Sequence, residues 1–102
     1  MNFFKKKTTV FITLENPDFM AETPKLWSDL LYALEGHKVK QVTIRLYDTG
    51  DLSMRVISVI VSLALKLKRE EVVLELEAST ALLQTLRRLN MTHVFSELVE
   101  VA

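Results

Sequence analysis

The stretch from Asp48 to Arg69, a polar loop followed by a long apolar helix, constrains the fold of this chain more than any other part of its sequence. On a helical wheel at about 100° per residue, the polar residues of the helix fall in one stripe roughly 80° wide. That stripe consists of Arg55, Ser58, Ser62, Lys66 and Arg69. The rest of the circumference is apolar and spans about twice the arc that a helix needs in order to lie on one sheet. We therefore expect this helix to contact a neighbouring helix, a partner chain or both, in addition to a sheet.

The same stretch is too short to cross a membrane. Between Arg55 and Lys66 it has an apolar run of about ten residues, interrupted by Ser58 and Ser62, whereas a membrane span needs about twenty. The chain of 102 residues has a formal net charge of zero, so no overall field draws it to nucleic acid or anionic lipid. Its one charge run, Lys5-Lys6-Lys7, is typical of a solvated edge. We expect neither a membrane span nor a nucleic-acid partner.

The residues that catalysis and metal binding require are missing or isolated. The chain has no cysteine, and its two histidines, His37 and His93, lie far apart in the sequence. Neither glycine belongs to a phosphate-binding loop pattern, and no serine stands in a G-x-S-x-G elbow. Asp48 and Asp51 share one loop without a third ligand, which is typical of a turn. We expect no metal, no cofactor and no enzymatic activity. The start of the chain is not typical of a signal peptide, so a cytoplasmic location is expected.

On both sides of the central helix, segments in which every second residue is apolar alternate with segments in which apolar residues recur about every 3.6 residues. In order, they predict a short strand at Phe3-Phe4, a strand over residues 8–15, a helix from Thr23-Pro24 to Gly36, a strand over residues 39–47, the central helix, a strand over residues 72–76, a helix over residues 79–89 and a short helical piece over residues 92–98. The last four residues are interpreted as an edge strand or a frayed end.

The ends of the helices carry capping residues. Thr23 and Ser79 are expected as N-caps, and Asn90 as a C-cap. Strands that alternate with helices of several turns favour parallel pairing through right-handed crossovers. The sequence therefore predicts one α/β domain over residues 1–102.

Nearly the whole chain resembles a STAS domain, the module named for sulfate transporters and anti-sigma-factor antagonists. Residues 14–24 are similar to the first strand, loop and helix entry of that family, and residues 79–95 to its last crossover helix and the turn that ends in a phenylalanine. The resemblance implies a mostly parallel sheet of four to five strands with helices mainly on one face. It places Asp51-Leu52-Ser53-Met54 at the phosphoacceptor loop of the family.

The phosphoacceptor motif itself departs from the family pattern. Ser53 is the only hydroxyl at this junction, and Met54-Arg55 stands where a serine or threonine followed by glycine is expected. Two interpretations of Ser53 remain open. A serine just before a helix is a common N-cap, a role that Asp51 fills equally well. A phosphoserine at the same position suits a switch, because the helix dipole tolerates its charge while a partner does not.

The resemblance implies a regulatory module that binds a kinase-like anti-sigma factor or a stressosome-type partner. The expected partner-binding residues lie in the loop and on the flank of the central helix, and they are Asp48, Thr49, Gly50, Asp51, Ser53, Met54, Arg55, Ser58 and Val61. An alternative is an accessory subunit that docks on the ATPase of a lipid-transport ABC complex. A second alternative, based on fold analogy, is a nucleotide or anion site at the carboxyl ends of the strands. A homodimer is compatible with each of them.

Overall fold

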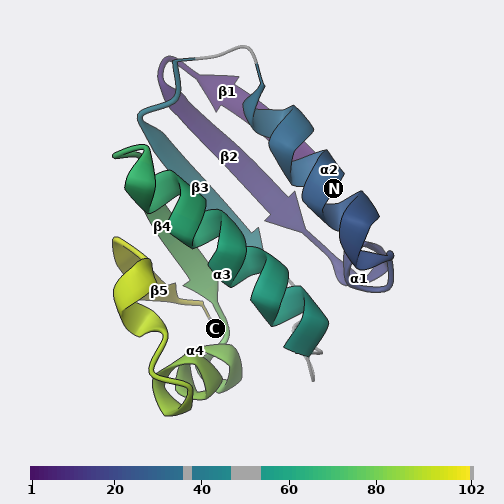
Figure 1. The fold of residues 1–102 in the computed structure, drawn as a ribbon, viewed down its shortest axis with the longest axis vertical. Coiled ribbons are helices and arrows are strands. Elements are labelled where there is room, and N and C mark those ends of the chain that lie inside the picture. Colours follow the sequence, from purple (N-terminus) through teal and green to yellow (C-terminus); the bar gives the residue numbers. More distant parts are fainter. Residues whose placement is uncertain (36–37, 47–53, 102) are drawn as a thin grey trace.

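A mixed five-stranded sheet forms one layer of the computed structural model, which describes residues 1–35, 38–46 and 54–101 (Figure 1). The strands lie side by side in chain order, and they are β1 (Asn2–Lys6), β2 (Thr9–Leu14), β3 (Gln41–Leu46), β4 (Val73–Ala78) and β5 (Glu97–Glu100). Strand β1 pairs with β2 in antiparallel fashion, and the other pairings are parallel. The helices are α1 (Asn16–Phe19), α2 (Thr23–Leu34), α3 (Met54–Arg69), α4 (Thr80–Arg88) and the 3₁₀ helix η1 (Thr92–Val94).

The helices gather on one face of the sheet because each crossover after β2 steps to the next strand in the same direction. A right-handed crossover that always steps the same way always places its helix on the same side. Helices α2 and α3 lie next to one another across the sheet (Figure 1). These findings confirm the predicted α/β class, with a mostly parallel sheet and helices mainly on one face.

Alternation along the strands separates the two faces of the sheet. The register places Ile12, Ile44 and Leu76 side by side on three neighbouring strands, and all three are almost completely buried under the helices. Their sequence neighbours Thr43 and Glu75 point to the other face, which no helix of the described residues covers, although Thr43 itself is buried there. In a sheet that packs one face against helices and exposes the other to solvent, apolar and polar residues alternate along each strand in this way.

The apolar arc of α3 is almost entirely used within the chain itself. Its buried residues are Val56, Ile57, Val59, Ile60, Val61, Leu63, Ala64 and Leu67. Besides the sheet, α3 contacts α2 on one side and η1 on the other. Of the apolar residues that the helical wheel placed in the arc, only Met54 and Leu65 are exposed. The neighbouring helices therefore account for the wide arc, and a partner chain is not needed to explain it.

The helix caps follow the sequence in one case out of the three. The Ser79 hydroxyl accepts a bond from the Leu82 N–H (3.3 Å), which confirms it as an N-cap. The prediction for Asn90 was wrong by one position, because Leu89 is the C-cap of α4 and Asn90 follows it with a φ of 57°, the left-handed conformation that asparagine tolerates. The prediction for Thr23 was wrong by one position. Helix α2 already includes Thr23, and the Glu22 carbonyl accepts the first helical bond, from the Leu26 N–H (3.0 Å).

The prediction of a helical piece over residues 92–98 was wrong in its second half. Only η1 is helical, and the chain then enters β5, so that the end of the chain forms an edge strand. The Ser96 N–H donates to the Leu74 carbonyl (2.9 Å), and the Ser96 hydroxyl accepts from the Leu74 N–H (3.0 Å). These bonds to β4 override the weak local preference for a helix. Val94 and Phe95 of this segment are both buried in the core.

Shortening buried side chains on the central strands tests the assigned core. We expect Ile44→Ala and Leu74→Ala each to reduce the free energy of unfolding by about 2–5 kcal/mol, because both leave a cavity under α3. Val73→Ala, at a half-exposed position of the same strand as Leu74, should cost less than about 1 kcal/mol. Urea unfolding of the three variants measures this difference. Costs below about 1 kcal/mol at both core positions would contradict the assigned core.

Candidate functional site

The structure describes only part of the predicted partner-binding surface. Asp48, Thr49, Gly50, Asp51 and Ser53 lie outside the described residues. The described part begins at Met54, the first residue of α3. The surface can therefore be built from the flank of this helix and from the elements that lie beside it.

Three of the four predicted residues on α3 are open to solvent. Met54 is 54% exposed, and Arg55 and Ser58 are also exposed. Val61 is buried within its own chain and offers little surface to a partner. Ser62, one turn beyond Ser58, is exposed and continues the same flank towards the carboxyl end of the helix. The exposed flank is thus formed by Met54, Arg55, Ser58 and Ser62.

A hollow of about 400 Å³ lies between this flank and the first turns of α2. The α2 side consists of Thr23, Pro24 and Trp27, and the α3 side of Ser58 and Ser62, with Val59 between them. Trp27 is half-buried and packs against the core with part of its ring. Hydroxyl groups and a proline thus surround an aromatic side chain that keeps some of its surface open.

The sequence alone did not place Trp27 beside the flank of α3. Trp27 precedes Leu30, Leu31 and Leu34 at helical spacing, which predicts packing, and its contact with the core agrees with that role. Its place next to Ser58 depends on the two successive crossovers, which set α2 and α3 parallel and start both helices at the carboxyl ends of the strands. The only local signal was the presence of a tryptophan in the first turns of a helix.

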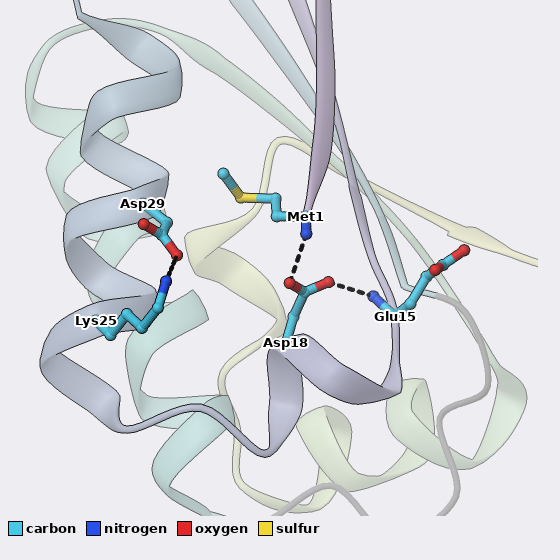
Figure 2. A network of polar contacts seen from close by, with 5 residues as sticks. All are labelled: Met1, Glu15, Asp18, Lys25 and Asp29. Carbon is cyan, nitrogen blue, oxygen red and sulfur yellow. Dashed lines mark hydrogen bonds and ion pairs between the residues drawn. The ribbon is translucent and has the colours of Figure 1, made fainter.

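The loop that leads into α2 is held by an ion pair with the first residue. The amino group of Met1 lies 2.6 Å from one carboxylate oxygen of Asp18, and the other oxygen accepts the Glu15 N–H at 2.9 Å (Figure 2). On α2 itself, the Lys25 ammonium donates to Asp29 at 2.9 Å, a bond that raises the pKa of Lys25. These contacts fix the wall of the hollow that α2 provides.

The solvated face of the sheet carries a row of carboxylates. Glu75 on β4 lies directly opposite Glu97 on β5, and both point away from the helices. Partial burial raises the pKa of the Glu75 carboxyl, and the charges of Glu97 and Glu77 raise it further. Arg45 acts in the opposite direction, and its Nε lies 2.5 Å from the Glu77 carboxylate. This face is acidic at the β5 side and has no apolar hollow among those described.

The described residues contain no group of three or more histidines and carboxylates that could hold a metal ion. Within the same residues, every helix is too short or too polar to cross a membrane. Comparisons of the chain with protein-family models, with curated proteins and with solved structures gave no match. The surface beside Trp27 therefore has to be interpreted from its own geometry.

Trp27 should report on its half-buried position. We expect its fluorescence maximum in the folded protein to be blue-shifted from that of free indole, because the ring packs against the core, and to move to the red when urea unfolds the chain. Emission spectra with and without urea measure this. A native spectrum equal to that of free indole would place Trp27 fully in water and contradict the packing.

Replacing Glu75 should change how stability depends on pH. A raised pKa means that the Glu75 carboxyl holds its proton more tightly in the folded protein than in the unfolded chain. Protonated Glu75 therefore stabilises the fold at low pH, and this stabilisation is lost as the pH rises through the folded pKa. Glu75→Gln does not titrate, and it removes a like-charge pair that costs about 0.2–1 kcal/mol. We expect the variant to be more stable than the parent at pH 7, with the difference shrinking near pH 4.

Thermal melts of the parent, Glu75→Gln and the control Glu35→Gln across this pH range measure the effect. Glu35 is exposed at the end of α2 and lies far from the acidic row. A Glu75→Gln variant that is no more stable than the parent at pH 7 would refute the assigned repulsion.

Proposed function

We propose that this chain is a non-enzymatic protein-interaction module of the anti-sigma-factor-antagonist type. The observation that carries the proposal is the exposed flank of α3 (Met54, Arg55, Ser58 and Ser62) beside the hollow at Trp27. In chain order this flank directly follows the loop that resembles the phosphoacceptor loop of STAS domains. The one-sided α/β architecture agrees with the fold that the resemblance implies.

The chemistry of the surface suits a protein partner. An aromatic ring with a half-open face, surrounded by small hydroxyl groups, offers a partner both apolar contact and hydrogen bonds. Because the chain itself buries most of the apolar arc of α3, a partner that binds this helix has to use the exposed flank. Both partner classes implied by the resemblance, a kinase-like anti-sigma factor and a stressosome protein, fit this mode of binding, and a cytoplasmic location belongs to the proposal.

Ser53 is the proposed switch of this surface. It directly precedes Met54, the first residue of α3. Transfer of the γ-phosphoryl group of ATP to its hydroxyl would add up to two negative charges at the start of a helix, where the dipole tolerates them. A partner surface that accepts the neutral hydroxyl would then meet a charge that it cannot pair. Phosphorylation would therefore release the partner without unfolding the module.

The departure of Met54-Arg55 from the phosphoacceptor pattern favours a second candidate function. An accessory subunit that docks on the ATPase of a lipid-transport ABC complex needs the same helix flank but no phosphorylation. The side chains of Met54 and Arg55 are both exposed, so both are available to such a partner. The identity of the neighbouring genes separates the two candidates, since the first predicts a kinase-like ATPase and the second an ABC ATPase.

The Ser58→Arg variant tests the surface itself. Ser58 is exposed, so a larger side chain should leave stability unchanged, while an arginine beside Trp27 blocks the hollow. We expect affinity for the partner ATPase encoded beside this chain, measured by calorimetry, to fall at least about tenfold, or about 1.4 kcal/mol. Gln84→Arg, an equally exposed site on α4, should bind like the parent. Unchanged affinity in Ser58→Arg would refute the proposed surface.

The Ser53→Asp variant separates the switch from the accessory subunit. Aspartate caps a helix as well as serine, whereas alanine loses about 0.5–2 kcal/mol of capping energy. Under the switch, Ser53→Asp keeps its melting temperature and binds the partner at least about tenfold more weakly. Mass spectrometry after incubation with the kinase-like ATPase and ATP should also find one phosphoryl group on the parent and none on Ser53→Ala. Full affinity of Ser53→Asp, with only Ser53→Ala destabilised, would leave Ser53 as a helix cap.

A further inference from the structure

A second hollow lies at the edge of the sheet opposite to the proposed site. It has a volume of about 920 Å³ and lies between the last turns of α2 and α3, where strands β3 and β4 begin. Its floor is apolar and consists of Leu31, Leu34, Val39, Leu67 and Val72, most of them only half-buried. This volume is within the range of hollows that bind ligands or partner side chains.

Tyr32 stands at the rim of this hollow. Its side chain is 67% exposed and is held in place by an edge-to-face contact with Phe3, with 6.3 Å between the ring centroids. An exposed ring that is already ordered loses little entropy when a partner packs against it. Thioether groups make favourable contacts with the edge of such a ring.

The edge around the hollow is basic. Lys38 lines the hollow, and Lys6, Lys7 and Lys40 lie at the same edge, since the Lys40 N–H donates to the Thr8 carbonyl (2.8 Å). Cations in the last turn of a helix complement its dipole, but these four lysines lie outside the helices.

The carboxylates that line the hollow do not cancel this charge. Asp29 and Glu70 form ion pairs with Lys25 and Lys66, which neutralise them. Glu35 is the remaining carboxylate among the described lining residues. The net charge of the residues at this edge is therefore positive, although the whole chain has a formal net charge of zero.

The opposite edge of the sheet has an exposed apolar side chain near acidic residues, which complements the apolar floor and basic surround of the hollow. Met20 is 84% exposed, more than any other large apolar side chain described, and it follows α1. The exposed carboxylates of Glu15 and Glu22 flank it in the sequence. The turn is ordered, since the Ala21 N–H donates to the Asp18 carbonyl (3.3 Å) and Asp18 is bound by the Met1 amino group. An apolar side chain between two acids thus stands on a fixed turn.

We propose that a second copy of this chain docks head to tail, with Met20 of one copy in the hollow beside Tyr32 of the next. The thioether would lie on the apolar floor, and Glu15 and Glu22 would face Lys38 and the neighbouring lysines. Figure 1 shows α1 beside the first turn of α2 and the last turn of α2 at the other end of that helix. Because Met20 and the hollow are two different surfaces, the contact is heterologous and can repeat from copy to copy along an open chain. It does not involve the flank of α3 and is independent of the proposed function.

The contact is small and partly electrostatic, so its affinity should be low and should depend on salt. We expect the weight-average mass of the parent, measured by sedimentation equilibrium, to rise with protein concentration in about 0.05 M NaCl. In about 0.5 M NaCl the dissociation constant should increase at least about tenfold, because the screening length shortens. A parent that stays monomeric at about 1 mM, far above the concentrations at which weak contacts form, would overturn the proposal.

Two variants test the two sides of the contact separately. Met20→Ser removes the inserted side chain, and Lys38→Glu reverses the charge at the hollow. Both sites are exposed, so the fold should persist, which circular dichroism checks. Each variant alone should remain monomeric. The controls Leu89→Gln and Arg88→Glu, both exposed at the end of α4, should associate like the parent.

Mixing the two variants gives the sharpest result. Met20→Ser keeps an intact hollow, and Lys38→Glu keeps an intact Met20, so the mixture should form a one-to-one dimer and nothing larger. A mixture that stays monomeric, or single variants that associate like the parent, would refute head-to-tail docking.

Discussion

The burial of α3 against the central strands is the interaction on which the rest of the structure depends. Its buried positions cover an arc of about 200° at about 100° per residue. Half of a helix surface cannot be covered by a sheet alone, so α2 and η1 close in on both sides. The position of α2 then fixes β1 and β2, and the position of η1 brings β5 to the edge of β4. Loss of apolar contact at the centre would therefore loosen elements from both ends of the chain.

This packing also limits where the molecule can bind something else. Because the apolar arc is used internally, the exposed side of α3 is a narrow and mostly polar flank. Hollows lie between α2 and α3, and one lies along α3 itself beside Leu65. The groove between α2 and α3 has hollows near both of its ends. One lies at the helix starts, beside Trp27. The other lies at the helix ends, with an apolar floor and a basic surround.

The distribution of charge follows from the same topology. When parallel strands are joined by crossover helices, all of these strands begin at one edge of the sheet and all of these helices begin at the opposite edge. Lys38 and Lys40 precede β3 and Glu22 precedes α2, so these charges lie at opposite edges, although Glu70 and Glu71 precede β4 at the edge with the lysines. A chain with zero net charge can therefore have two edges of opposite sign. Regulation by a partner at one surface and association between copies through other surfaces are compatible in such a molecule.

The sequence by itself determined the features that depend on nearby residues. Ser79 is a helix cap because its hydroxyl reaches an N–H three residues away, and Ile44 is buried because strand neighbours alternate. The tertiary structure decided the features that depend on distant pairing. Residues 97–100 became a strand only because β4 offered its free edge, and Trp27 met Ser58 only because two crossovers set their helices side by side. Met20 shows no local pattern, and its exposure follows from the turn that Asp18 holds. Local propensity acts over a few residues, whereas these contacts join residues that only the completed sheet brings together.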